Sequence, residues 1–386
     1  MAKDIHVMRE KYSFYCHAMR VGQKLVYYVI YHIIVLWFIF FPSQTQAPAA
    51  RPKPSALFVF GDSTVDAGNN NFLRTPMKSN FPPYGRDFIN HIPTGRFSNG
   101  RLVTDFVASY TGVKDIVPAY LDPTLTIQDL MTGVSFASAG SGFDPMTATL
   151  SSVISMEQQM EYFKEYKSKM EMLIGKDNTV ELIKKAVFML SAGTNDYIVN
   201  YYGLGEPVTQ VMYTNVTAYR NYLIQNIEQF VKELINEGAR KIAMVGLPPM
   251  GCLPEVITLN RYAATHERTC VEPMSYVATD YNVYLENKLK DIQISEAKLY
   301  YADIYKPILD MIRFGTKKLG FEEVNIGCCG SGYVEAAALC NMNSAVCEDA
   351  TKYVFWDAIH PTEQAYYYVF TTLRPVIDRV LNDYIN

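Results

Sequence analysis

Two short motifs near opposite ends of the chain carry the side chains that nucleophilic hydrolysis requires. Ser63 ends the run Phe58–Ser63, and Asp357 stands three residues before His360 in the run Trp356–Pro361. A serine hydroxyl is a weak nucleophile at neutral pH, so a histidine must take its proton and a carboxylate must orient the imidazole. The motifs therefore predict Ser63 as nucleophile, His360 as general base and Asp357 as the orienting acid.

Two further blocks offer donors for an oxyanion hole. Gly140 follows an apolar run, and Asn195 lies in the turn Gly193–Asp196. Together with the backbone N–H of Ser63, the backbone N–H of Gly140 and the amide of Asn195 would stabilise a tetrahedral oxyanion, each donor contributing about 3–4 kcal/mol. Each block alone is typical of an ordinary turn. Their order along the chain, each just past a strand or before a helix, favours catalysis.

The elements that must position these residues alternate between strands and helices. Short apolar runs predict buried parallel strands; these are Ala56–Phe60, Val134–Ala137, Val187–Ser191, Lys241–Val245 and Lys298–Ala302. Helical periodicity lies between and after them; it covers 155–172, 216–237, 274–289 and 363–382. This alternation predicts an α/β fold with a parallel sheet. The loops at the carboxyl ends of such strands form the ligand crevice, which is where the motifs fall.

A long stretch, Asn69 to Arg101, does not fit this alternation. It holds three Pro-bearing turns and many Asn and aromatic residues. A loop of this length inside a compact domain is usually functional or disordered, and its aromatic content argues against disorder.

Composition excludes some classes of function. Apolar residues make up 49% and charged residues 19% of 386 residues, which indicates a folded chain with a sizeable core. The net charge is −4, and residues 51–386 carry 30 basic against 37 acidic side chains. A mildly acidic body without a basic stripe argues against a nucleic-acid partner. Oligomeric state is left open.

The first fifty residues are predicted to be a targeting segment, and residues 51–386 a single domain. Leu25–Phe41 carries no formal charge, follows Arg20 and Lys24, and precedes a small-residue cleavage site at Ala47–Ala49. That order is typical of a secretory signal, so we expect a secreted, extracellular protein. Seventeen apolar residues also reach the lower limit of a membrane-spanning helix, which leaves a signal anchor as the alternative. A start at Met19 would give a conventional signal length.

Cysteine usage agrees with export. Cys16 lies in the targeting segment, which leaves six cysteines, and an even number in an exported chain predicts three disulfides. Six cysteines allow about 15 pairings, which the sequence does not resolve. A zinc site at Cys328–Cys347 is the alternative, but the spacing lacks a Cys-x-x-Cys pair. Asn215-Val216-Thr217 is a candidate N-glycosylation site.

Through these motifs, the chain resembles the plant GDSL esterase/lipase family of the SGNH hydrolase superfamily over residues 54–384. The nucleophile block of that family is similar to Phe60–Asn70, and its other blocks fall on Gly140, on Asn195 and on Asp357 with His360. Three longer stretches are similar to the plant branch; they are Asn80–Phe88, Pro93–Arg101 and Leu247–Pro254. Thr64 replaces the leucine that names the motif. This position carries no proton in the reaction, so we expect activity to survive.

The resemblance implies a three-layer α/β/α sandwich of flavodoxin-like type, with a five-stranded parallel sheet and an open, shallow site. It implies carboxylic ester substrates, such as lipid acyl esters, acetylated sugars or phenolic esters, and no metal or organic cofactor. Two alternatives are left open. An acyltransferase would use the same acyl-enzyme with an alcohol acceptor, and a non-catalytic binding or defence protein would use only the scaffold.

Overall fold

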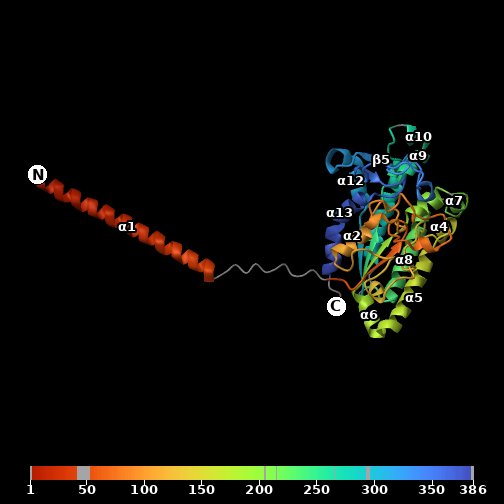
Figure 1. The fold of residues 1–386 in the computed structure, drawn as a ribbon, viewed down its shortest axis with the longest axis horizontal. Helices are drawn as coiled ribbons and strands as arrows, with labels where there is room; N and C mark the ends of the chain where they lie inside the picture. The colour runs from red at the N-terminus through yellow and green to blue at the C-terminus, as the bar shows by residue number, and fades with distance from the viewer. Residues whose placement is uncertain are drawn as a thin grey trace. The chain divides into compact units, whose positions relative to one another are not determined.

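The computed structural model describes residues 2–40, 53–203, 206–213, 215–265, 267–292 and 296–383. The chain divides into two compact units, Met1–Ala50 and Arg51–Asn386. In the first unit, helix α1 spans Ala2–Phe40 (Figure 1). Among the described residues, no helix combines the length and the apolar character that crossing a membrane requires. The predicted cleavage site at Ala47–Ala49 lies outside the described residues.

A parallel sheet of four strands in the order β1-β2-β3-β4 lies at the centre of the second unit. The strands are β1 (Leu57–Gly61), β2 (Val187–Ser191), β3 (Lys241–Val245) and β4 (Lys298–Ala302). Two short strands, β5 (Glu323–Gly327) and β6 (Tyr353–Phe355), pair in parallel in a second sheet. The predicted α/β class with a parallel sheet is confirmed.

The predicted count of five strands in the main sheet is wrong by one, because residues 134–137 form only isolated bridges beside β1. Val59 N–H donates to the Val134 carbonyl (3.1 Å), and Phe136 N–H donates to the Val59 carbonyl (2.8 Å). Gly133 and Gly140 adopt φ values of 92° and 90° and bend the chain at both ends of the segment. The segment therefore follows β1 for a short distance and then turns into the site.

Helices cover both faces of the main sheet, in three layers (Figure 1). Alternate residues of a strand point to opposite faces; in β1, Phe58 and Phe60 pack toward α5, α8 and α11, whereas Leu57 and Val59 pack toward α2, α12 and α13. The helices of this unit are α2 (Val103–Tyr110), α3 (Ile127–Met131), α4 (Pro145–Ser151), α5 (Met156–Ile174), α6 (Lys176–Lys185), α7 (Glu206–Met212), α8 (Val216–Asn236), α9 (Pro254–Leu259), α10 (Arg261–Thr265), α11 (Glu272–Asp291), α12 (Tyr305–Phe314) and α13 (Glu363–Asn382). Both faces of β1 and β2 are buried, as continuous apolar runs require, whereas β3 and β4 are partly exposed.

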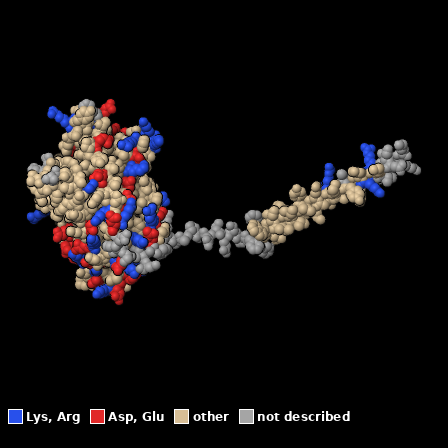
Figure 2. Space-filling model, turned by 180° about the vertical axis from the view of Figure 1, so that it is seen from behind, with Lys and Arg blue, Asp and Glu red and all other residues tan. Residues whose placement is uncertain are grey.

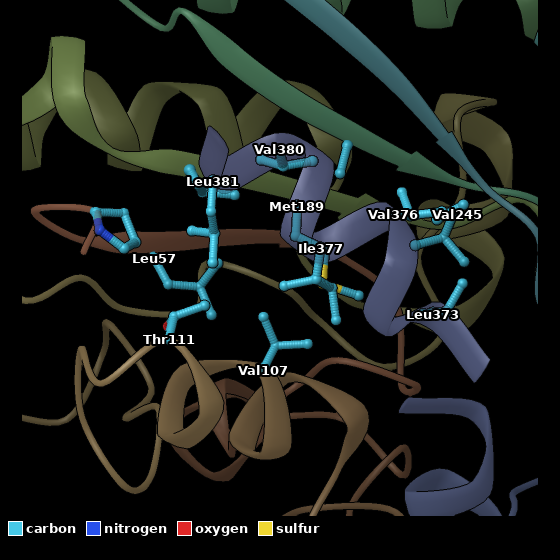
Figure 3. A pocket seen from close by; sticks show the side chains of 14 residues that line it. Leu57, Val107, Thr111, Met189, Val245, Leu373, Val376, Ile377, Val380 and Leu381 are labelled. Carbon is cyan, nitrogen blue, oxygen red and sulfur yellow. The ribbon is translucent and has the colours of Figure 1, made fainter. Parts of the chain in front are cut away.

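A small apolar cavity of about 50 Å³ remains between the sheet and the helices α2 and α13. Figure 3 shows Val107 of α2 and Ile377 and Val380 of α13 directed into it. Thr111 also lines the cavity, and its hydroxyl donates to the Ala108 carbonyl (3.0 Å). An apolar cavity offers water no partners, so we expect it to stay dry. Its described lining residues include no titratable side chain, so it is not a candidate active site.

Charged side chains of both signs are interspersed over the face of the second unit that Figure 2 shows. Several charged side chains of this unit pair, for example Lys164 with Glu161 and Glu233, and Lys288 with Glu228. On this face, the described part of the chain shows no continuous basic stripe of the kind that a phosphate backbone would need.

Candidate active site

The structure brings the side chains of Ser63, His360 and Asp357 together. Ser63 follows β1, while Asp357 and His360 lie between β6 and α13. The Nε2 atom of His360 is 2.8 Å from Ser63 Oγ, and its Nδ1 atom is 2.8 Å from Asp357 Oδ2. Because Nδ1–H donates to the carboxylate, the lone pair of Nε2 faces the serine hydroxyl. Ser63 is 7% exposed, so it borders the cavity, whereas Asp357 is fully buried.

The spacing of three between Asp357 and His360 follows from a local turn. Asp357 Oδ1 accepts hydrogen bonds from the backbone N–H groups of Ile359 (2.9 Å) and His360 (2.7 Å). An aspartate that accepts backbone donors two and three residues on forms a self-supporting turn. Trp356 N–H closes the turn by donating to the His360 carbonyl (2.7 Å). One carboxylate thus shapes the loop and orients the imidazole.

Two disulfide-bonded cysteines, Cys328 and Cys329, hydrogen-bond to the strand end that leads into this turn. Cys328 N–H donates to the Phe355 carbonyl (3.0 Å), and Cys329 N–H donates to the Trp356 carbonyl (2.8 Å). The described disulfides are Cys252–Cys270, Cys328–Cys347 and Cys329–Cys340. The prediction of three disulfides is confirmed, and they occupy the thiols that the alternative zinc site would need. The side chain of Cys16 lies outside the described residues.

The oxyanion candidates surround Ser63 in the same cavity. Ser63, Gly140 and Asn195 all line it. In the described part of the chain, the backbone N–H groups of Ser63 and Gly140 donate to no protein acceptor. Asn195 Nδ2 donates to the Ser141 carbonyl (3.0 Å), which fixes the amide and leaves its second hydrogen for a ligand. At Gly140 the φ of 90° excludes most side chains, and a Cβ would lie 3.0 Å from that of Ser151.

Residues just past the nucleophile hold the Gly140 segment in place. Asp66 Oδ2 accepts the N–H of Ala139 (3.0 Å). Asn69 Nδ2 donates to the carbonyls of Ser135 and Ala137, each at 2.8 Å, and Asn70 Nδ2 donates to the Ala139 carbonyl (2.9 Å). The block that carries Ser63 therefore also positions Gly140, a candidate oxyanion donor.

The Asn195 block is fixed to the Gly140 block through its aspartate. Asp196 accepts the N–H groups of Phe143 (2.8 Å) and Asp144 (3.0 Å). Its carboxylate fills the space beside Gly142, where a Cβ would lie 2.1 Å from Asp196 Oδ1. The two candidate oxyanion blocks are thus joined by hydrogen bonds to Asp196.

Thr64, which replaces the family leucine, is held by polar partners. Its hydroxyl donates to Asp62 Oδ1 (2.7 Å) and lies 3.0 Å from Ser191 Oγ. The threonine is accommodated beside the nucleophile without entering its hydrogen bond to His360.

Tyr84 and Phe97 belong to the site, although the sequence motifs did not single them out. Both lie in the long loop Asn69 to Arg101, within stretches that are similar to the plant branch of the family. The Tyr84 hydroxyl donates to Asp357 Oδ2 (2.7 Å) and accepts the N–H of Ala337 (2.9 Å). Burial and the Asp357 charge raise the pKa of Tyr84 well above its ordinary value, so the hydroxyl remains a donor. The Phe97 ring lies 4.8 Å from the His360 ring between centroids.

We expect Tyr84→Phe to lower kcat/KM for a p-nitrophenyl ester about tenfold, because Asp357 loses a donor and holds His360 less firmly. The matched control is Tyr166→Phe, which removes a buried hydroxyl that donates to the Leu130 carbonyl, in a part of the core outside the site. Steady-state kinetics and melting temperatures of both variants separate an effect on the site from an effect on packing. Equal activities of the two variants would show that Tyr84 only packs.

Three buried carboxyls around the site predict how stability depends on pH. Burial raises the pKa of Asp62 and of Asp66 to about 6 and that of Asp196 to about 7. Each group therefore binds its proton more tightly in the folded than in the unfolded chain. The stabilisation is present below the unfolded pKa of about 4 and is lost as the pH rises through about 6–7.

We expect the melting temperature to be a few degrees higher at pH 5 than at pH 8, which corresponds to about 1–3 kcal/mol. Calorimetry across this range checks the sign. Asp62→Asn should flatten the dependence, because the amide oxygen still accepts from Thr64 while the titrating group is gone. A melting temperature that rises steadily from pH 5 to pH 8 would contradict this assignment.

Ser63 and His360 open onto a cavity of about 570 Å³. Much of its lining is apolar; Met77, Ile198, Val199, Val256, Leu259, Met274, Val334, Leu339 and Ile359 line it. Two of these side chains are also exposed to solvent, Leu259 at 73% and Leu339 at 62%. The cavity is large enough for an ester with a short acyl chain.

Comparison with known proteins shows which family the chain belongs to. Residues 57–373 match the family model described as GDSL-like Lipase/Acylhydrolase. A GDSL esterase/lipase of Arabidopsis thaliana is 51% identical over 347 residues, which cover 89% of this chain and 91% of that relative. A second from the same plant is 45% identical over 326 residues, covering 82% and 88%. The Arabidopsis GDSL esterase/lipase APG is 45% identical over 314 residues, covering 80% and 87%.

Proposed function

We propose that this chain, which belongs to the GDSL-like lipase/acylhydrolase family and is a carboxylic ester hydrolase, cleaves esters through an acyl-enzyme on Ser63. The observation that carries this proposal is the chain of contacts from Ser63 Oγ through His360 to Asp357, at 2.8 Å for each step. This arrangement joins a nucleophile, its base and the group that orients the base.

In the first half of the reaction, Ser63 Oγ attacks the ester carbonyl carbon while His360 Nε2 takes the hydroxyl proton. The carbonyl oxygen becomes an oxyanion, which the N–H groups of Ser63 and Gly140 and the amide of Asn195 stabilise. The intermediate collapses, the bond to the alcohol oxygen breaks, and His360 returns the proton to that oxygen. Water then attacks the acyl-enzyme by the same steps, and the carboxylic acid leaves.

The cavity supports lipid or other acyl esters as the substrate class. Its apolar side chains can cover an acyl chain, and the exposed lining residues Leu259 and Leu339 reduce the cost of moving that chain out of an apolar phase.

Secretion and glycosylation are part of the proposal. Residues 1–50 would act as the targeting segment and 51–386 as the single hydrolase domain, in line with the two compact units. Asn215 is exposed just before α8, where its Oδ1 accepts the N–H of Ala218 (2.9 Å). Its amide nitrogen, the atom that a glycan would modify, is thus not needed for this cap.

A fluorophosphonate probe tests the proposal directly, together with hydrolysis of p-nitrophenyl esters of increasing acyl length. We expect ester turnover and one covalent adduct, located by mass spectrometry on the peptide that contains Ser63 and absent in Ser63→Ala. A folded chain that neither hydrolyses esters nor reacts with the probe would support the non-catalytic alternative. Acylated glycerol formed in preference to free acid, with glycerol present, would support an acyltransferase instead.

A further inference from the structure

A carboxylate without a protein partner lies in the wall of the catalytic cavity. Glu255 lines the same cavity as Ser63 and His360. Among the described residues, no side chain or backbone donor is within hydrogen-bond distance of its carboxylate, and no cation pairs with it. By contrast, the buried carboxylate of Asp105 pairs with Arg96. Glu255 is partly exposed, and because it lines the cavity its carboxylate oxygens are free to accept hydrogen bonds from a ligand.

The backbone fixes Glu255 beside the catalytic turn. Glu255 N–H donates to the Ala358 carbonyl (2.9 Å), between Asp357 and His360, so α9 is tied to the loop that carries both. Burial raises the pKa of Glu255, the Asp357 charge adds to that rise, and His360 opposes it. The carboxylate is therefore close enough to the catalytic pair to sense both charges.

A second side chain on the same wall has a free polar group. Asn260, the residue that follows α9, also lines the cavity. Its Oδ1 atom accepts the N–H of Ala263 (3.0 Å), and within the described chain its Nδ2 atom has no acceptor. The wall therefore offers one acceptor, at Glu255, and one donor, at Asn260, to a ligand.

We infer that Glu255 and Asn260 form a subsite for the free hydroxyl groups of the alcohol half of the ester. The preferred substrates would then be esters of polyhydric alcohols, such as acylglycerols or acylated sugars. This inference rests on the proposed function, because His360 must deliver its proton to the alcohol oxygen that leaves. An alcohol seated at His360 would place its other hydroxyls toward this wall.

Hydroxyl groups fit this wall better than a cation does. Apart from Ser63 and His360, the other polar side chains of the lining, Asn195 and Tyr202, are neutral, and no second carboxylate lines the described cavity. A cationic alcohol would usually be held by several aromatic faces. Of the two aromatic side chains in the lining, Phe97 is already packed on His360.

The test compares kcat/KM for 1-monooctanoylglycerol and methyl octanoate, which share the acyl chain and differ in the alcohol. Wild type should prefer the glycerol ester. In Glu255→Leu the ratio of the two values should fall about tenfold, since the charged acceptor is gone, and in Glu255→Gln it should fall less. The matched control is Glu272→Gln, which removes an exposed carboxylate from the first turn of α11, as Glu255 occupies the first turn of α9. Its ratio should equal that of wild type.

Three results would overturn the inference. The first is a ratio that Glu255→Leu leaves unchanged in protein that melts like wild type. The second is a preference of wild type for octanoylcholine over the glycerol ester, together with the loss of that preference in Glu255→Gln. The subsite would then bind a cationic alcohol. The third is turnover of neither octanoyl ester by wild type, which would remove the proposed function on which the subsite depends.

Discussion

Replacing His360 by alanine is expected to lower kcat for a p-nitrophenyl ester by about 10⁴–10⁶-fold. Without the imidazole, the Ser63 hydroxyl loses the base 2.8 Å away that would take its proton. The leaving alcohol also loses its proton donor, so both halves of the reaction fail together. Ser63→Ala should lower kcat by a similar factor, since it removes the attacking atom itself.

A variant that carries both Ser63→Ala and His360→Ala tests whether the two residues act together or independently. Because Ser63 and His360 act as one unit, Ser63→Ala with His360→Ala together should be no slower than either alone. The matched control is His91→Ala, which removes an exposed imidazole in the long loop and should retain wild-type kinetics. Additive losses in the double variant, or activity of His360→Ala within tenfold of wild type, would contradict the triad.

The predictions that succeeded rest on local patterns. Apolar runs such as Val187–Ser191 and Lys241–Val245 form strands of the main sheet because both of its faces are covered by helices. The helix predicted over 216–237 is α8, whose apolar residues recur on one face. The Asp357–His360 spacing is a local turn, which is why the motif alone indicates the geometry.

What the sequence did not show depends on contacts between distant segments. Tyr84 and Asp357 meet across 273 residues of chain, and no periodicity relates them. Gln159 lies on α5, where glutamine usually faces solvent, yet its side chain hydrogen-bonds both the N–H and the carbonyl of Gly61 just before the nucleophile. The pairing of the six cysteines likewise depends on which loops meet in the fold. Such contacts become visible only in three dimensions.

The long loop that delivers Tyr84 and Phe97 is itself held by a buried ion pair. Arg96 contacts Asp105 through two hydrogen bonds of 2.9 Å, and the two side chains are 4% and 0% exposed. The guanidinium also donates to the carbonyls of Ala67 (3.2 Å) and Val117 (2.6 Å). It therefore joins the segment after the nucleophile to the loop that contacts His360.

Arg96→Met is expected to lower the free energy of unfolding by about 3–5 kcal/mol, because it leaves the Asp105 carboxylate buried without its partner. Urea unfolding of the variant, with the slope of the transition compared to wild type, measures the loss. Arg96→Lys should lose most of the same energy, since an ammonium cannot reproduce two parallel bonds. Lys185→Met, which breaks a pair with Glu181 in which both side chains are more than half exposed, should leave the midpoint unchanged.

Because Arg96 precedes Phe97, its loss should also disturb the site before the chain unfolds. We expect the activity of Arg96→Met to fall at temperatures where most of the protein is still folded, as the loop loosens over His360. Two results would contradict this account: an unfolding free energy within about 1 kcal/mol of wild type, or an activity that declines together with the folded fraction. Either result would mean that apolar contacts, rather than the buried ion pair, hold the loop over His360.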